Sequence, residues 1–316
     1  MKGIQFSTVN VSSPKNRERF SGLALKLWIK GMALLFLVYC IPALNAMDWP
    51  SLEGNLIHNF GWNDGGQALL GTSFETEGPV LAAEKGEIFF TDTNRKKASR
   101  LPSPLGVWTA VDHGDGLVSI YSRLDGAKPI REAGSVEKGS YLAEAGTTGW
   151  SAQKGFYFSL FDRKERRWVN PAMIVNRLPD TSPPFIRSVG LRNQEGRLIE
   201  LDSTQARTVS QGRYTVLADV VDTLMPAGKY PLAPYLIGCL VNGSEIGLLN
   251  FETYSARDGV LMVYRNGLVP VKQVYAPYPR FEIGNVSLTR GQVNLQISAQ
   301  DINENRREEQ FRLIVE

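Results

Sequence analysis

Short apolar runs separated by glycine turns fill residues 47–178. The runs are Val80–Ala83, Glu87–Thr91, Val107–Val111, Leu117–Tyr121, Tyr141–Ala145 and Phe156–Phe161. Turn sequences such as Gly114-Asp115-Gly116 stand between them, and no stretch repeats its apolar residues with the 3.6-residue period of a helix. Closely spaced short strands with glycine turns are typical of an antiparallel barrel or sandwich, so this segment is predicted to be all β.

The segment 186–316 shows a second β pattern. Two apolar runs flank Asn242-Gly243, which is a strong hairpin signal, and another Asn-Gly pair stands at Asn266-Gly267. The apolar runs of this segment are 216–221, 233–241, 246–251, 260–264, 281–283, 293–299 and 311–315. They predict an immunoglobulin-like β-sandwich. The polar stretch Ser298–Asn305, with Asp301 and Asn303, resembles the last turn of bacterial immunoglobulin-like modules.

Three prolines within residues 179–185 favour an extended backbone. This stretch is predicted to be a linker. The expected domains are therefore an N-terminal domain over 47–178 and a β-sandwich over 186–316.

Residues 1–46 have the pattern of a leader. Lys26 and Lys30 precede an apolar run from Met32 to Leu44, and the small residue Ala46 follows. A basic flank, a short apolar run and a small residue are typical of a secretory signal. The run of about 13 residues is shorter than the roughly 20 that span a bilayer. Export to the periplasm or extracellular envelope is therefore expected, and an uncleaved membrane anchor is the alternative.

Removal of the leader changes the charge of the chain. The leader carries six of the 35 basic residues and one of the 32 acidic residues, which leaves 29 and 31. The basic surplus belongs to the leader, so the composition gives no electrostatic support for nucleic-acid binding. One cysteine follows the leader. It is Cys239, in an apolar run, where we expect a buried and inert thiol.

Residues 60–174 carry short motifs in a defined order. They are Phe60-Gly61-Trp62, Gly78–Ala83 with Lys85–Ile88, Val111–Leu117 leading to Ile120–Leu124, Gly134–Gly139, Ala145–Gly149, and Gly155–Asp162 followed by Asn170-Pro171. In this order and spacing they resemble the M23 peptidase family, also called LytM or lysostaphin-like domains. The resemblance implies an antiparallel M23-like β domain over 47–178.

Active members of that family bind one zinc ion through a His and an Asp four residues apart and the second His of a His-x-His strand. The alignment places the first pair on Leu69 and Ser73, and the strand on Tyr157 and Ser159. Zinc requires about three nitrogen, oxygen or sulfur ligands and one open position for water. The resemblance therefore implies a degenerate member with no catalytic residue, metal or cofactor.

The remaining positions support the same interpretation. If the alignment is shifted by two residues, the first pair falls on Gln67 and Gly71, which are no better zinc ligands. The family's Tyr-x-His-Leu segment has Arg123 in place of its His. The chain has two histidines, His58 and His113, which cannot fill four histidine positions. His58 is expected in a surface loop.

His113 and Asp115 are expected to support the central hairpin. A surrogate metal site of Asp112, His113 and Asp115 is disfavoured, because side chains alternate between the two faces of a strand.

An empty M23 site still implies a groove. The groove is expected to include the degenerate positions, with a glutamine near its rim: Leu69, Ser73, Arg123, Tyr157, Ser159 and Gln67. Arg123 either pairs with a carboxylate of a peptide stem or forms a structural ion pair. Trp150 is one of several tryptophans that either contact glycan or pack at the rim.

The predicted function is that of a non-catalytic envelope protein. Catalytically empty relatives recruit and activate cell-wall amidases, so the resemblance implies regulation of a peptidoglycan amidase. Passive peptidoglycan binding is a second hypothesis. An active or residual peptidoglycan metalloendopeptidase with a non-standard site is the third, and the missing ligands weigh against it.

Overall fold

The computed structural model describes residues 46–93, 103–151, 153–224, 229–275 and 278–316. Apart from Ala46, the predicted leader lies outside these residues, so cleavage and export stay predictions. Backbone contacts group residues 46–316 into one compact unit. Within the described residues, no helix combines the length and apolar character needed to cross a bilayer.

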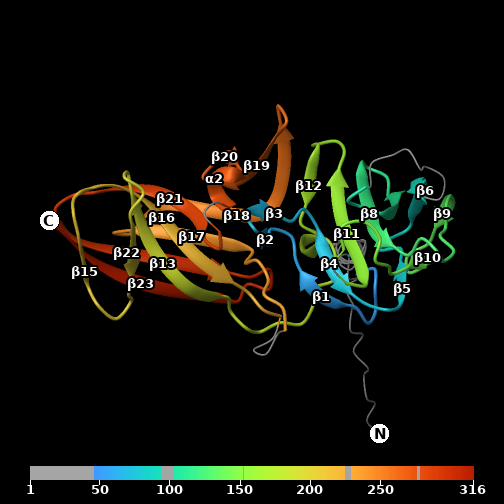
Figure 1. The fold of residues 1–316 in the computed structure, drawn as a ribbon, viewed down its shortest axis with the longest axis horizontal. Coiled ribbons are helices and arrows are strands. Elements are labelled where there is room, and N and C mark those ends of the chain that lie inside the picture. Colours follow the sequence, from blue (N-terminus) through green and yellow to red (C-terminus); the bar gives the residue numbers. More distant parts are fainter. Residues whose placement is uncertain (1–45, 94–102, 152, 225–228, 276–277) are drawn as a thin grey trace, which may run out of the picture. The chain divides into compact units, whose positions relative to one another are not determined.

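Strands form nearly all the regular structure of the N-terminal half (Figure 1). In chain order they are β1 (Asn55–His58), β2 (Asn63–Asp64), β3 (Gln67–Ala68), β4 (Thr72–Glu75), β5 (Pro79–Leu81), β6 (Gly86–Asp92), β7 (Val107–Asp112), β8 (Leu117–Leu124), β9 (Gly134–Val136), β10 (Tyr141–Glu144), β11 (Gly155–Asp162) and β12 (Arg167–Val169). The short 3-10 helix η1 (Pro171–Met173) follows.

The N-terminal core lies on one face of the sheet β12-β11-β8-β7-β6-β9, in which β11 also pairs with β4 and β4 pairs with β1. Phe74 on β4 stacks on Phe156 of β11 with 4.9 Å between ring centroids. Phe158 and Tyr121 extend the same cluster on β11 and β8. Side chains alternate across a strand, so the residues between these aromatics point to the opposite face.

The described part of the C-terminal half is also formed by strands, with one short helix. Its elements are β13 (Phe185–Asn193), β14 (Leu198–Leu201), β15 (Arg207–Val209), β16 (Gly212–Val221), β17 (Leu236–Val241), β18 (Ser244–Arg257), β19 (Val260–Arg265), β20 (Leu268–Pro270), α2 (Lys272–Tyr275), β21 (Phe281–Leu288), β22 (Gly291–Gln300) and β23 (Arg306–Val315).

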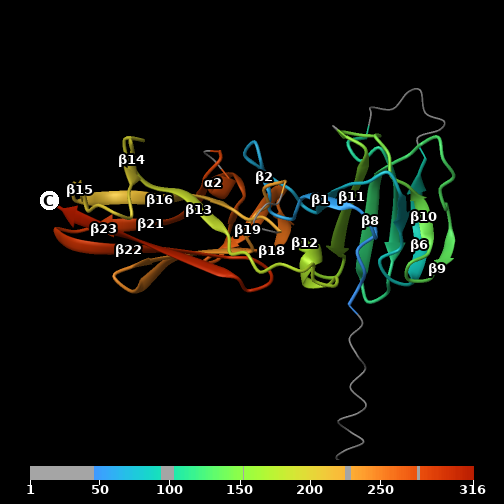
Figure 2. The same cartoon turned by 90° about the horizontal axis from the view of Figure 1, so that it is seen from below.

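Two sheets enclose the core of this half (Figure 2). One sheet has the order β14-β13-β16-β21, and the other continues the large sheet through β18-β17-β22-β23-β15. Val216 and Ala218 of the first sheet and Leu295 and Ile297 of the second belong to one buried cluster. The prediction of an all-β fold is confirmed, while an immunoglobulin-like topology stays a prediction.

Hydrogen-bonded strands continue from the N-terminal half into the C-terminal half. Strand β12 pairs with β18, with Trp168 opposite Tyr254. Phe60 lies in the C-terminal core against Tyr254, and the Tyr275 hydroxyl donates to the Gly61 carbonyl at 2.7 Å. The first predicted motif, Phe60-Gly61-Trp62, therefore contributes to the core of the C-terminal half.

The predicted linker has no regular structure until β13 begins at Phe185. Its carbonyl groups accept hydrogen bonds from the last loop and strand: Asn305 Nδ2 donates to Asp180 at 3.2 Å and Arg307 Nε to Pro184 at 2.9 Å. The predicted domain boundaries stay predictions.

The apolar runs and turns identified most of the long strands. Asn242 and Gly243 have positive φ values of 50° and 82° and join β17 to β18, as the hairpin signal predicts. Cys239 is buried, and burial raises the pKa of its thiol to about 12. The short strands β1, β4 and β12 were not predicted from the sequence.

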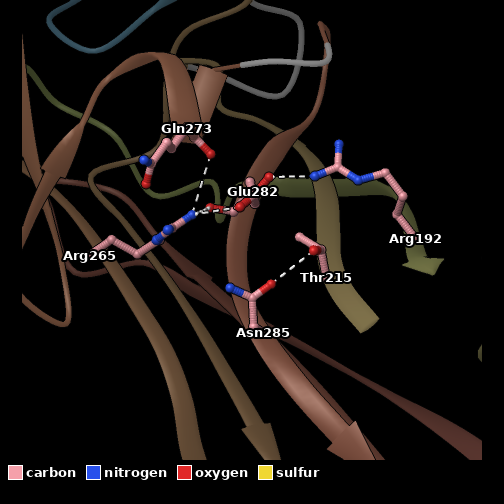
Figure 3. Close-up of polar contacts among 6 residues, drawn as sticks. All are labelled: Arg192, Thr215, Arg265, Gln273, Glu282 and Asn285. Carbon is pink, nitrogen blue, oxygen red and sulfur yellow. Dashed lines mark hydrogen bonds and ion pairs between the residues drawn. The ribbon is translucent and has the colours of Figure 1, made fainter. Parts of the chain in front are cut away.

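A carboxylate between two arginines links three elements of the C-terminal half (Figure 3). Glu282 on β21 accepts from Arg192 of β13 at 2.6 Å and from Arg265 of β19 at 3.2 Å. Arg265 also donates to the carbonyls of Glu282 and, in α2, of Gln273. Arg265 and Glu282 are largely buried, so each charge depends on its partners for stabilisation.

We expect Glu282→Gln to lower the free energy of unfolding by about 2–3 kcal/mol, because it leaves the buried Arg265 without a counter-charge. Urea denaturation measures the change. Glu308→Gln removes an exposed partner of Arg306 and is the matched control, with an expected cost below about 1 kcal/mol. Equal effects of the two substitutions would contradict a structural role for the buried pair.

Candidate functional site

A groove of about 250 Å³ lies where β1, β4, β8 and β11 meet. Residues from these strands and from two nearby loops line it: Ile57, His58, Ser73, Phe74, Arg123, Ser151, Gln153, Phe156 and Tyr230. It is therefore built from segments that are distant in the sequence.

Strand register brings the polar residues of the groove together. Ser73 of β4 is the register partner of His58 on β1 and of Tyr157 on β11. Tyr157 is in turn opposite Ser122 on β8. Directly opposed residues in antiparallel strands share a face of the sheet, so this row lies on the face opposite the Phe74 and Phe156 core.

Arg123 carries the positive charge of the groove. Its guanidinium carbon lies 5.2 Å from the centroid of the Tyr157 ring, within cation–π range. Among the described residues, no carboxylate forms an ion pair with it, and its pKa is lowered by burial against the opposing influence of Tyr157 and Asp64. Its φ of 65° is unusual for a residue other than glycine, and such strained residues cluster at functional sites.

His58 is a groove residue that the sequence did not identify. It ends β1, so its expected place in a surface loop is wrong. The imidazole stacks on Trp62 with 5.0 Å between centroids, and its buried Nδ1 has no hydrogen-bond partner. Burial lowers its pKa, and the Arg123 charge acts in the same direction. The sequence did not predict β1, because this strand is stabilised by its pairing with β4 and has no local sequence signal.

The Tyr157 ring fills the space beneath the chain at Leu70 and Gly71. Burial raises the pKa of the Tyr157 hydroxyl, which also forms a hydrogen bond with the Leu70 backbone. A Cβ atom on Gly71 would lie 2.7 Å from Tyr157 Cζ and 2.8 Å from Ser159 Cβ, so only glycine permits this approach. Ser159 is buried behind this contact and does not line the groove.

Two further positions that the alignment placed at the first zinc-ligand pair, Leu69 and Gln67, lie at or next to β3. Leu69 exchanges backbone hydrogen bonds with Gly61 and Trp62, and Gln67 is exposed on β3. Neither lines the groove. The structure thus brings Ser73 and Arg123 to the groove wall, with Tyr157 packed under the arginine.

Tyr230 forms part of the groove and was not identified from the sequence. Its hydroxyl donates to Glu75 at 2.8 Å, and Lys229 lies 3.5 Å from the same carboxylate. This hydrogen bond lowers the pKa of Glu75. The contact spans more than 150 residues of sequence, which explains why no local pattern signals it.

His113 supports the hairpin at the other end of β8. One ring nitrogen lies 2.8 Å from the Lys85 carbonyl and the other 2.7 Å from Ser119 Oγ. Ser119 donates to the buried Tyr121 hydroxyl, which accepts from the Ala83 amide. Both ring nitrogens of His113 are therefore engaged within the N-terminal half.

The acidic neighbours of His113 have other partners. Asp112 pairs with Arg163, and the exposed Asp115, at a turn position with φ of 51°, lies 3.5 Å from Lys164. The structure does not gather these two carboxylates and the imidazole around one point.

The donors of the groove do not fit a catalytic zinc ion. Within the described ranges, a single group of three or more His, Cys, Asp or Glu side chains has ligand atoms that converge within 4.8 Å, and that group is outside the groove. The groove instead offers one imidazole, one guanidinium and the neutral polar side chains of Ser73, Ser151, Gln153 and Tyr230. A fixed positive charge next to Tyr157 opposes a divalent cation, so we derive no reaction step through zinc.

Comparison with known proteins finds a family match within the N-terminal half. Residues 69–171 match the sequence model of peptidase family M23, and a second family model without a descriptive name matches residues 183–316. No curated protein matches the chain.

Similar solved structures include M23 domains. The catalytic domain of the prophage-encoded M23 protein EnpA from Enterococcus faecalis is 18% identical, with 40% of this chain and 94% of that chain covered and a TM-score of 0.33. Lysostaphin from Staphylococcus simulans is 15% identical, with coverages of 69% and 86% and a TM-score of 0.33. A chain of the SpoIIQ–SpoIIIAH pore-forming complex is 14% identical, with coverages of 43% and 94% and a TM-score of 0.34.

We expect His58 to titrate below the ordinary histidine pKa of about 6.5. The folded protein then binds fewer protons than the unfolded chain over the window just below that value, so the free energy of unfolding falls as the pH drops through it. Burial lowers the pKa of His113 as well, which adds to the same trend. Urea denaturation between about pH 7.5 and 5 measures the slope.

Replacement of one histidine separates the two contributions. With two histidines in the chain, His58→Gln leaves one imidazole Cε1–H signal to follow by NMR and should flatten the pH dependence. A His58 signal that titrates at or above 6.5 would contradict the buried, neutral imidazole.

Proposed function

We propose that this chain, in which residues 69–171 form a domain of peptidase family M23, is a non-catalytic cell-envelope protein that binds through its groove and regulates a peptidoglycan amidase. The envelope location follows from the leader pattern of residues 1–46. The observation that carries the proposal is the Arg123 guanidinium, which lines the groove and pairs with no carboxylate among the described residues.

Arginine supports recognition of a carboxylate. Its planar guanidinium forms two parallel hydrogen bonds with one carboxylate, and such charge-assisted bonds are about twice as strong as neutral ones. Partial burial increases this interaction, because the effective dielectric is lower than in water. His58 and the Ser73 hydroxyl add neutral hydrogen-bonding groups beside it. The groove therefore suits an acidic side chain or a peptide carboxylate.

Regulation requires that binding favour one state of the amidase. A groove that captures an acidic segment of an inhibitory element would shift the amidase population towards its open form. Peptidoglycan binding without regulation is the second candidate, and Trp150 favours it: this side chain is 75% exposed beside Ser151 of the groove, where it offers an aromatic surface to a glycan.

An assay with labelled sacculi tests these functions. The protein is incubated with sacculi alone, with a purified envelope amidase, and with both, and released fragments are measured. Faster release when both are present supports regulation, and co-sedimentation with sacculi without faster release supports the binding-only alternative. Fragment release by this protein alone would overturn the non-catalytic proposal in favour of a metalloendopeptidase with a non-standard site.

We expect Arg123→Gly to reduce amidase stimulation, or sacculus binding, by roughly 10-fold or more, which corresponds to the loss of one charge-assisted contact. Glycine accepts the positive φ of this position, so the melting temperature should change by only a few degrees.

Arg166→Gly is the matched control. Arg166 is an exposed arginine with a φ of 54° on the β11–β12 turn, outside the groove. Equal losses in the two variants would show that general positive charge, and not the groove, mediates binding.

A further inference from the structure

Three carboxylates from separate segments converge in the C-terminal half. Asp180 precedes β13, Asp222 follows β16 and Asp301 follows β22. One oxygen atom from each lies within 4.8 Å of the others. All three residues line a cavity of about 50 Å³, and Asn303 lines it as well.

Two buried oxygen atoms at this cavity have no hydrogen-bond partner. They are Oδ1 of Asp222 and Oδ1 of Asn303. Asp222 is only 6% exposed, and its backbone is fixed by a pair of hydrogen bonds with Leu232. Burial of a carboxylate oxygen without a partner is costly unless a counter-charge or a metal compensates it.

Neighbouring basic residues do not supply this counter-charge. None of the ion pairs within the described residues involves Asp180, Asp222 or Asp301. Arg177 also lines the cavity, but its ion-pair partner is Glu304, 3.9 Å away.

Asp301 is already held in a fixed orientation. Its two oxygen atoms accept from the amide nitrogen of Asn305 at 2.8 Å and from Asn305 Nδ2 at 2.7 Å. Asn303 Nδ2 donates to the Leu178 carbonyl at 2.9 Å, which leaves its Oδ1 directed away from that bond. The polar turn is thus preorganised with oxygen donors at the cavity.

We propose that Asp180, Asp222, Asp301 and the side-chain oxygen of Asn303 bind a calcium ion. All the donors are oxygen atoms, which are the ligands that calcium takes in proteins. Calcium–oxygen bonds measure 2.3–2.6 Å, so two ligands of one ion lie at most about 5 Å apart, and the three carboxylates meet this limit because their oxygen atoms lie within 4.8 Å of one another. Water would complete the coordination. The cavity of about 50 Å³ has room for it, since one water molecule needs roughly 10–15 Å³.

The ion would join three segments that the backbone does not connect. It would attach the segment that leads into β13 to the loops after β16 and β22. Because these donors converge only in the folded chain, calcium should stabilise the folded state by mass action.

Thermal unfolding of the purified protein in EDTA, CaCl₂ and MgCl₂ tests the site. At a calcium concentration about 100 times the dissociation constant, we expect the melting temperature to rise by roughly 5–10 °C relative to EDTA. Calorimetric titration with CaCl₂ should show about one ion per chain. No rise with calcium, or an equal rise with magnesium, would overturn the proposal.

Asp222→Asn keeps the shape of the side chain and removes its charge. It should abolish most of the calcium-dependent rise, while its melting temperature in EDTA is not below that of the unaltered protein, since repulsion among the carboxylates is relieved. Asp258→Asn is the matched control, on an exposed Asp-Gly turn with φ of 49°. It should retain the full rise, and a rise in Asp222→Asn equal to that of the control would contradict the site.

Discussion

The packing of Tyr157 beneath Gly71 is the contact on which the candidate groove depends. The Cβ atom of any other residue at 71 would lie 2.4 Å from the Phe158 carbonyl oxygen, so the chain can approach β11 only with glycine there. The tyrosine ring then fills the space under the loop and presents its face to Arg123. Its burial fixes the ring, and the ring in turn orients the guanidinium in the groove.

This arrangement has a direct electrostatic consequence. Burial is the main cause that lowers the pKa of His58, and the Arg123 charge acts in the same direction, so the groove holds one positive charge and disfavours a second. A metal cation would be a second charge of that kind. A bound carboxylate has the opposite effect, since it would pair with the guanidinium and favour protonation of the imidazole. The same two side chains that disfavour zinc therefore favour an anionic ligand.

Local sequence patterns identified those parts of the fold that have local causes. Apolar runs bounded by glycine or Asn-Gly turns gave the long strands, because turn geometry at residues such as Gly243 is set by the adjacent chain. The position of Arg123 in the groove followed from family resemblance. His58 and Tyr230 were missed, because pairing with β4 and a hydrogen bond to Glu75 place them there. The three carboxylates of Asp180, Asp222 and Asp301 likewise come together through long-range contacts, which the spacing of residues in the sequence does not reveal.

Strand pairing and core packing connect the two halves of the chain in addition to the predicted linker. Strand β12 of the N-terminal half pairs with β18, and the Asn170 side chain that caps η1 also donates to the Phe251 carbonyl at 3.0 Å. Phe60, from the start of the M23-like motifs, is fully buried in the C-terminal core. Separation at the linker would expose this phenylalanine and leave two strand edges unpaired. The C-terminal half therefore supports β12, which in turn pairs with the groove strand β11.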